Sequence, residues 1–190
     1  MTVSGKPTIL FVPGLGGSGP GHWQTLWERD IPDARCVEQA DWNAPQRADW
    51  IRTLKDALDK TPGAVVVAHS LGCILLAHVA AEYPTLPIKA GLLVAPADVE
   101  SAGPAREAVQ GFGPIPMQRM PFPSAVVTSA DDPYVLVERA GVFAAAWGAT
   151  LINIGRCGHI NVEAGFGPWP EGKKILERLI ADATATSEKP

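Results

Sequence analysis

The sequence predicts an α/β protein with a mostly parallel sheet of about six strands and helices on both faces. Short segments with nearly unbroken apolar centres alternate along the chain with segments of helical periodicity. Such apolar strands are typical of parallel sheets that are covered on both sides. The chain has 190 residues and no internal repeat. These observations favour one domain over residues 1–190, with a core at about residues 7–183.

The expected elements follow one another from residue 8 onward. Apolar runs identify the strands, and periodicity with flanking Pro or Gly identifies the helices. The expected strands are 8–12, 34–38, 64–67, 88–95, 124–129 and 150–154. The expected helices are 22–29, 46–60, 73–83, 135–147 and 171–183. Residues 184–190 are expected to form a loose tail.

Composition argues against several classes of function. The formal net charge is -4 and the chain has no basic run, which disfavours nucleic acid as a partner. No apolar run approaches the roughly 18 residues of a membrane span, and the first residues lack the apolar core of a signal peptide. The three cysteines, Cys36, Cys73 and Cys157, are widely spaced, which favours free thiols over a disulfide framework or a metal site. We therefore expect a cytoplasmic protein.

The most informative segment is the apolar strand 64–67 followed by Ala68-His69-Ser70-Leu71-Gly72. Small residues on both sides of a serine, between a strand and a helix, are typical of a nucleophile elbow. Ala68 stands where glycine is usual in that pattern. The turn is cramped, so it requires small neighbours, and it raises the serine hydroxyl out of the backbone. Ser70 is therefore the candidate nucleophile, and it needs a base and an orienting acid.

Two later strands end in residues that could supply these groups. The strand 124–129 runs into Asp131-Asp132-Pro133, and the strand 150–154 runs into a loop that contains His159. Functional groups of a parallel sheet gather at the carboxyl ends of its strands. The order Ser, Asp, His along the chain is the order that α/β-hydrolases use. We therefore predict Asp132 as the acid and His159 as the base, with Asp131 as the alternative acid.

Three other histidines compete for the role of base. The elbow should turn His69 away from the site, because its neighbour Ser70 takes the exposed position. His78 falls in the middle of a helix and is expected to pack or to face solvent. His22 lies near a glycine-rich loop and could line the site, although it precedes the nucleophile. These arguments leave His159 as the preferred base.

An acyl-transfer site also needs N–H groups that stabilise the negative oxygen of the tetrahedral intermediate. The N–H of Leu71 is one candidate, because the dipole of the following helix adds to its effect. The other candidate is the N–H of Leu15, in the loop that follows the first strand. Gly14 would let the backbone of that loop approach the substrate closely.

With these residues in place, the chain resembles the α/β-hydrolases. More narrowly, it resembles the small lid-less serine hydrolase family that includes retinoblastoma-binding protein 9 and bacterial YdeN-type proteins. The matching segments are VPGLGG at 12–17, GHW at 21–23, AHSLG at 68–72, SADDPY at 129–134, CGHIN at 157–161 and GFGPWPEG at 165–172. The resemblance covers about residues 7–183. It implies the triad Ser70, Asp132 and His159, a single domain without a large cap, and no cofactor.

Two other readings compete with the hydrolase. Residues 14–19 fit the pattern G-x-G-x-x-G after a strand, and Glu38 follows about 20 residues later, as in a dinucleotide-binding fingerprint. However, Pro20-Gly21 separates that motif from the next helix, whose N-terminus should hold the pyrophosphate. The second alternative is a non-catalytic protein-binding module on a hydrolase fold. An intact triad argues against it, because a pure scaffold has no need of all three groups.

Two further features bear on the substrate. Trp42 lies in the loop after the second strand, which should open on the same sheet edge as Ser70, so we hypothesise that it lines the substrate pocket. The irregular stretch 96–123 is rich in proline and apolar residues. It is interpreted as a small flap near the site or, alternatively, as a long crossover between two strands. The expected activity is hydrolysis of a small carboxylic ester, or of a thioester or amide, through an acyl-serine intermediate.

Overall fold

The sheet has six parallel strands, as the sequence predicts. A computed structural model describes residues 6–102 and 105–187. The strands lie in the order β2-β1-β3-β4-β5-β6, and each neighbouring pair is parallel. Their bounds are β1 (Ile9–Val12), β2 (Ala34–Cys36), β3 (Ala64–His69), β4 (Ile88–Val94), β5 (Ser124–Thr128) and β6 (Thr150–Asn153).

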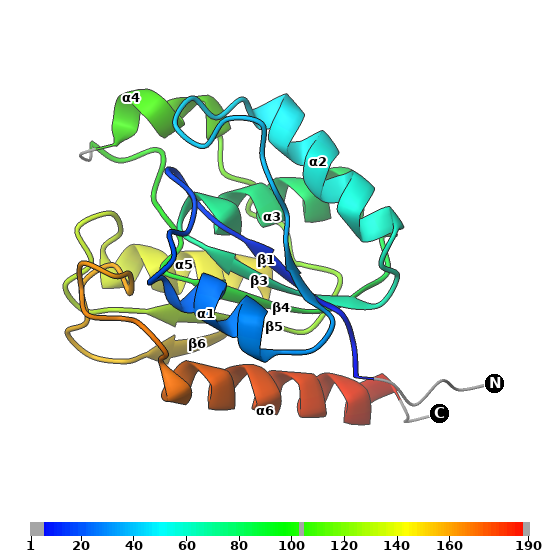
Figure 1. Cartoon of the computed structure of the whole chain (residues 1–190). Helices are drawn as coiled ribbons and strands as arrows, with labels where there is room; N and C mark the ends of the chain where they lie inside the picture. The colour runs from blue at the N-terminus through cyan, green and yellow to red at the C-terminus, as the bar shows by residue number, and fades with distance from the viewer. Residues whose placement is uncertain (1–5, 103–104, 188–190) are drawn as a thin grey trace.

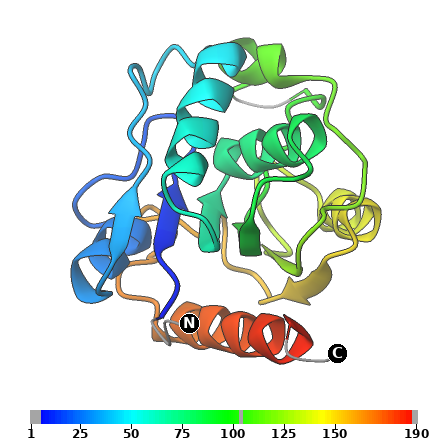
Figure 2. The ribbon, with the colours of Figure 1, turned by 90° about the vertical axis from the view of Figure 1, so that its right-hand side faces the viewer.

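Helices cover both faces of this sheet. They are α1 (Trp23–Asp30), α2 (Arg47–Asp59), α3 (Leu71–Glu82), α4 (Arg106–Val109), α5 (Val137–Trp147) and α6 (Pro170–Ser187), with a 3₁₀ turn η1 (Gln110–Phe112) after α4. Figures 1 and 2 show α2 and α3 on one face, with α6 along the other. No separate cap domain is evident over the described residues.

The alternation of side chains along the strands explains the two layers. Successive strand residues point to opposite faces, so each buried strand contributes to two cores. Leu10 and Val12 belong to the cluster that contains residues of α2, α3 and α5, whereas Ile9 and Phe11 belong to the cluster that contains residues of α1 and α6. Burial on both sides is why these strands read as unbroken apolar runs.

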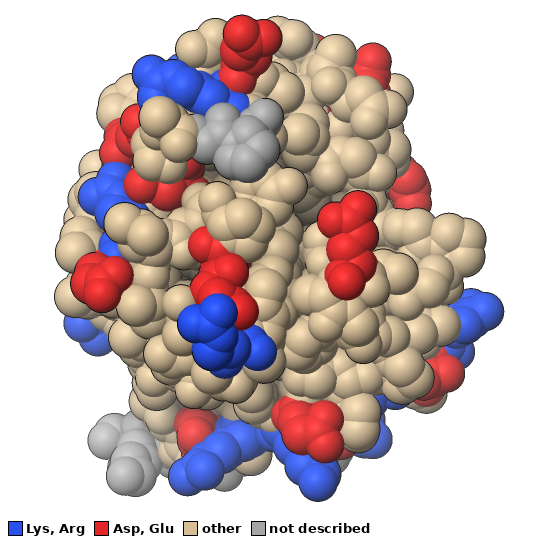
Figure 3. Space-filling view, turned by 90° about the vertical axis from the view of Figure 1, so that its left-hand side faces the viewer, with Lys and Arg blue, Asp and Glu red and all other residues tan. Residues whose placement is uncertain are grey.

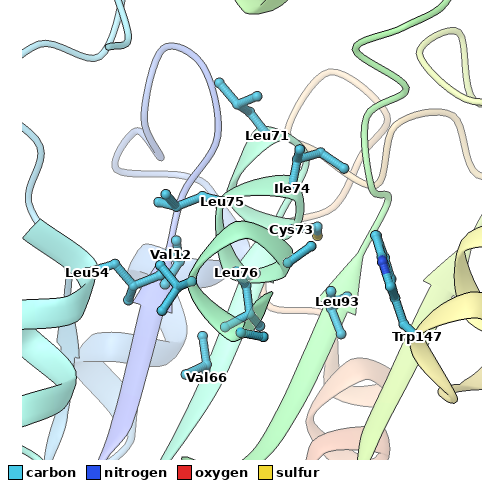
Figure 4. Packing of buried hydrophobic residues seen from close by; sticks show 14 of the residues in the cluster. Val12, Leu54, Val66, Leu71, Cys73, Ile74, Leu75, Leu76, Leu93 and Trp147 are labelled. Carbon is cyan, nitrogen blue, oxygen red and sulfur yellow. The ribbon is translucent and has the colours of Figure 1, made fainter. Parts of the chain in front are cut away.

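Helix α3 is the most buried helix of the fold. All ten residues from Leu71 to Ala80 are buried. Figure 4 shows side chains of α3 packed against residues of the sheet, such as Val66 and Leu93, and of α2, such as Leu54. A helix that is apolar on all sides belongs in a core. The helix that follows Ser70 is therefore held rigidly in place.

The strand order creates a switch point between β1 and β3. The chain leaves β1 toward β2 on one side and returns to β3 on the other side, so the loops after β1 and β3 diverge. Ligands of open α/β sheets bind at such points, outside the carboxyl ends of the strands. The loop at Pro13 and the serine Ser70 follow the two strands that form this switch point.

Two expected boundaries are corrected. Helix α3 begins at Leu71, directly after Ser70, and not at residue 73. The loose tail expected from residue 184 is also wrong for its first part, because α6 continues to Ser187. The hydroxyls of Thr184 and Thr186 donate to the carbonyls of Ile180 and Asp182, which supports this last turn. Residues 188–190 lie outside the described residues.

The segment 96–123 divides into two parts. Its later part is core, since Phe112, Ile115, Met120 and Phe122 are all buried. Its earlier part, which includes α4, covers the carboxyl edge of the sheet. Residues 103–104 within it lie outside the described residues. The segment therefore serves as the crossover between two strands, and its first part also covers the sheet edge. That this first part moves as a flap stays a prediction. No helix among the described residues is long and apolar enough to span a membrane.

Gly72 is expected to tolerate no side chain. A Cβ at this position would lie 2.1 Å from the carbonyl oxygen of Val12 and 2.8 Å from that of Pro13. Because both atoms are backbone, α3 or β1 must shift, and Gly72→Ala should lower the free energy of unfolding by about 3 kcal/mol or more.

Gly141→Ala is the matched control. The site lies within α5, and the nearest atom to its Cβ would be Leu151 Cδ2 at an ordinary 3.8 Å. Alanine should stabilise that helix by up to about 1 kcal/mol. Urea denaturation of both variants tests the contrast, and equal stability of the two would contradict it.

Candidate active site

The turn at Ser70 has the backbone of a strained elbow. Ser70 has φ 54° and ψ -122°, although it is not glycine. Non-glycine residues in such regions persist only where the surrounding structure holds them, and they cluster at functional sites. Here β3 ends at His69 and α3 begins at Leu71, so the turn consists of Ser70 alone. Its side chain is half-buried.

The loop after β1 contacts this elbow closely. A Cβ on Gly14 would lie 2.8 Å from Ser70 Cβ and 3.0 Å from the backbone nitrogen of Leu71. Gly14 therefore has to be glycine for the loop to come this near. The contact brings the backbone of Leu15 to the same side of the sheet edge as Ser70.

The structure brings Ser70, His159 and Asp132 into one chain of hydrogen bonds. His159 Nε2 lies 2.9 Å from Ser70 Oγ. On the other side of the ring, Nδ1 lies 2.9 Å from both carboxylate oxygens of Asp132. The Asp132 side chain is fully buried. A hydroxyl, an imidazole and a buried carboxylate in this order can move a proton from the hydroxyl to the ring.

The two adjacent aspartates have different partners. Asp132 also accepts from the N–H of Tyr134 at 2.9 Å. Asp131 instead accepts from the N–H of Gly158 and the hydroxyl of Ser129, each at 2.9 Å. These bonds, that to Gly158 first, lower the pKa of Asp131 below its usual value. Asp132 therefore lies against the imidazole, while Asp131 holds the backbone of the loop.

His69 lies where the sequence argument did not expect it. Its ring is 4.9 Å from the ring of His159, centre to centre, and it borders the same cavity. The expectation that the elbow turns His69 away from the site is therefore wrong. The elbow turns the side chain of Ser70, but the strand still points His69 to the face of the sheet that carries Trp23 and His159. Complete burial lowers the pKa of His69 well below its usual value.

The other two histidines have clear structural roles. His22 is the N-cap of α1, where its Nδ1 accepts from the N–H of Gln24, and its ring also lines the cavity. Burial, and then the charge of His159, lower the pKa of His22 to about 4. His78 is buried in α3 and its Nε2 bonds to the carbonyl of Phe112 at 2.7 Å. Neither contacts Ser70 as a base would.

A cavity of about 560 Å³ opens in front of Ser70. Ser70 and His159 form part of its wall, together with the glycine-rich loop, the start of segment 96–123 and the loop after His159. The apolar part of this lining includes Leu15, Leu71, Val109 and Val162, and the polar part includes Asp98, Arg106, Tyr134, Asn161 and Glu163. Figure 3 views the side on which the loops after β5 and β6 lie in Figure 1. Charged residues of both signs are scattered there, and most of the face is uncharged.

Two backbone N–H groups are available beside Ser70. The N–H of Leu15 has no acceptor among the described residues, although those of Gly16 and Gly17 donate to Trp42 and Gly14. Leu71 is the first residue of α3, where a helix offers its N–H no partner. Unpaired donors at such a point can receive a negatively charged oxygen.

Trp42 does not line the cavity, contrary to the hypothesis from the sequence. Its indole packs edge-on against Trp50, with ring centres 5.6 Å apart, and lies over Gly17. Its carbonyl accepts from the N–H of Gly16 at 2.8 Å. Trp42 therefore supports the glycine-rich loop from behind. The direction of a loop side chain cannot be derived from its position at the sheet edge.

The glycine-rich loop also differs from a dinucleotide site. Helix α1 begins at Trp23, four residues beyond Gly19, and a histidine caps it. The loop contacts the elbow and lines the cavity in front of Ser70. Over residues 6–102 and 105–187 no three His, Cys, Asp or Glu side chains are grouped so as to hold a metal ion.

Sequence reasoning missed the contacts of Tyr134 and His69 with the ring of His159. The ring of Tyr134 lies 4.4 Å from that of His159, centre to centre, and also lines the cavity. Its place directly after Asp132-Pro133 was a usable signal, because the turn that directs the carboxylate also fixes its neighbour. The contacts of His69 depend on which loop covers its face of the sheet.

Known structures share this fold. One described as a YdeN-like hydrolase, from Pectobacterium atrosepticum, is 32% identical with a TM-score of 0.83, and the match covers 94% of this chain and 92% of that chain. The ydeN gene product of B. subtilis is 21% identical, with a TM-score of 0.81 and coverage of 93% and 100%. A protein described as an aryl esterase from Burkholderia cenocepacia is 15% identical, with a TM-score of 0.73 and coverage of 94% and 91%.

A search of functionally curated proteins gives no match. The sequence profile described as Serine hydrolase matches residues 9–178, which is most of the chain. That span begins with β1 and includes Ser70, Asp132 and His159. Together with the 32% identical structure, the match supports one conclusion. This chain belongs to the serine hydrolase family and has the α/β-hydrolase fold.

Proposed function

We propose that this hydrolase cleaves small carboxylic esters through an acyl-serine intermediate. Thioesters and amides are the alternative substrates of the same chemistry. Ser70 is the proposed nucleophile, His159 the base and Asp132 the acid that orients it. The observation that carries this proposal is the continuous chain of hydrogen bonds, at 2.9 Å each, from Ser70 Oγ through His159 to Asp132.

In the first half of the reaction, Ser70 Oγ attacks the carbonyl carbon of the ester. Its proton passes to His159 Nε2, and the negative carbonyl oxygen of the intermediate accepts from the N–H groups of Leu15 and Leu71. Asp132 keeps the ring in the tautomer whose Nε2 can accept, and it stabilises the imidazolium. Loss of one oxyanion donor typically costs about 10²–10³ in rate.

The intermediate then collapses and releases the alcohol. His159 donates its Nε2 proton to the leaving oxygen, and the acyl group stays on Ser70. In the second half, His159 takes a proton from water, and the resulting hydroxide attacks the acyl carbon. The proton returns to Ser70 Oγ as the carboxylic acid leaves, so the enzyme regains its first state.

The neighbouring imidazoles do not compete for this proton. The pKa of His22 is about 4, and that of His69 is lowered well below its usual value. Both rings are therefore neutral at pH 7, and the proton from Ser70 stays on the ring that Asp132 contacts. His22, Gly14 and Leu15 then contribute only shape and backbone donors to the site.

The surroundings favour a small-molecule substrate. The cavity of about 560 Å³ is within the range of small-molecule sites, and its lining mixes apolar residues with polar and charged ones, among them Asp98, Arg106 and Glu163. The proposed partners are therefore small molecules, without a cofactor, nucleic acid or membrane surface. The cytoplasm is the proposed location, since Cys36, Cys73 and Cys157 are all free thiols.

A fluorophosphonate probe should add once to the wild-type protein and not at all to Ser70→Ala. The expected adduct forms because Ser70 Oγ has an imidazole nitrogen, His159 Nε2, within hydrogen-bond distance. Intact mass spectrometry measures the adduct, and circular dichroism establishes that both proteins are folded. If the folded wild type formed no adduct, the result would favour the alternative function, a non-catalytic protein-binding module.

The adjacent aspartates should respond differently to removal of the charge. Asp132→Asn is expected to lower kcat by as much as about 10⁴-fold, because the amide no longer holds the productive tautomer of His159. Asp131→Asn keeps an oxygen that can accept from Gly158, so its kcat should fall far less. Steady-state hydrolysis of p-nitrophenyl acetate compares them, and a larger loss in Asp131→Asn would reassign the acid.

Folding stability should decrease as the pH falls from about 6.5 to 4. Unfolded chains protonate His22 near pH 6.5, whereas the folded protein does so only near pH 4. Between these values the unfolded state binds more protons, so acid destabilises the fold, by at most about 3 kcal/mol from this group. Asn caps helices well and does not titrate, so His22→Asn should flatten the dependence. Parallel profiles of unfolding free energy in both proteins would refute this.

A further inference from the structure

We infer that His69 is a positioning residue. It lies directly before Ser70, the proposed nucleophile, and it fixes the loop that carries His159, the proposed base. The inference rests on the proposed function. His69 Nε2 lies 3.0 Å from the backbone carbonyl oxygen of His159. A carbonyl can only accept, so Nε2 carries the proton and donates it. One side chain thus joins the last residue of β3, directly before Ser70, to the residue proposed to take the proton of Ser70.

The loop at 157–160 depends on such side chains, because it lies beyond the end of β6. The N–H of Cys157 donates to Ser129 Oγ, and that of Gly158 to Asp131 Oδ1, each at 2.9 Å. The carbonyl of Ile160 accepts from Trp23 Nε1 at 2.9 Å. The bond from His69 holds the carbonyl of His159 itself, and the N–H of that peptide group, on Ile160, donates to the carbonyl of Cys157 at 3.3 Å.

The backbone on both sides of His159 adds to this dependence. Gly158 has φ 53°, and Ile160, a β-branched residue, has φ 49°. A branched residue in the left-handed region is unfavourable and persists only where its surroundings hold it. Ile160 is fully buried. The loop therefore requires its anchors to keep this shape.

His69 is suited to this role by its burial and its neutrality. Its side chain is 6% exposed, and its ring packs between those of His22 and His159, at 4.9 Å from each centre. Burial lowers the pKa of His69 well below its usual value, so the ring stays uncharged at pH 7 and does not oppose the imidazolium that forms on His159. A hydrogen bond from a buried donor is stronger than one in water.

The expected consequence is a loss of rate and not of substrate affinity. Ser70 Oγ and His159 Nε2 are 2.9 Å apart, and a displacement of about 1 Å in such a pair can cost about 10²-fold in rate. His69→Phe keeps an aromatic ring but removes the donor, and leaves the carbonyl of His159 unpaired. We expect kcat to fall about 10²-fold on p-nitrophenyl acetate, with a nearly unchanged KM.

His78→Phe is the matched control. His78 is also 6% exposed, and its Nε2 also bonds to a backbone carbonyl, that of Phe112 at 2.7 Å. It lies apart from Ser70, Asp132 and His159, so its loss should lower Tm without changing kcat of the folded protein. His69→Gln, whose amide can donate from a similar place, should recover most of the wild-type kcat. If His69→Phe does not fold, His69→Met, which packs with less strain, replaces it.

A second measurement does not depend on turnover. The proton between His159 Nδ1 and Asp132 should give a downfield signal in the proton NMR spectrum. It should shift or broaden in His69→Phe and stay in place in His78→Phe. An unchanged signal and kcat in His69→Phe, or equal losses in His78→Phe, would overturn the inference. Wild type that no fluorophosphonate labels would overturn the proposed function, and the NMR comparison would still decide the role of His69.

Discussion

The close approach of β1 to the start of α3 is the constraint on which the site depends. Gly72 has room for no side chain because the carbonyl oxygen of Val12 occupies the place of its Cβ. This contact fixes the turn at Ser70. It also sets how close the loop that begins at Pro13 lies to the start of α3. The nucleophile and the proposed oxyanion donors thus derive their relative position from one backbone contact. Parallel pairing of β1 with β3 keeps that contact in register.

The fold makes the surroundings of this contact rigid, whereas side-chain contacts hold the proposed base, His159. Helix α3 is buried on all sides, so the elbow has little freedom. The loop at 157–160 has no strand partner, and side chains from β3, α1 and the turn after β5 hold its peptide groups. Residues far apart in sequence thus converge on one short loop. The site combines a rigidly held Ser70, the proposed nucleophile, with a proposed base, His159, whose place depends on polar side-chain contacts.

The sequence predicts the sheet well, and it leads to the three residues that the structure brings together, because both depend on local signals. Apolar runs mark the strands; Ser70 directly follows β3, and Asp132 and His159 lie four and six residues beyond the ends of β5 and β6. It fails for Trp42 and His69, whose surroundings depend on which distant segment covers them. It also ends α6 too early, because threonines with poor helix propensity receive support from carbonyls one turn back.

The adjacent pair Asp131 and Asp132 separates two kinds of control over the imidazole. Asp131 holds the main chain at Gly158 and so sets where the ring is located. Asp132 contacts Nδ1 and so sets how the ring is rotated about its own axis. Translation and rotation of the ring can therefore be altered one at a time, by single substitutions at neighbouring positions.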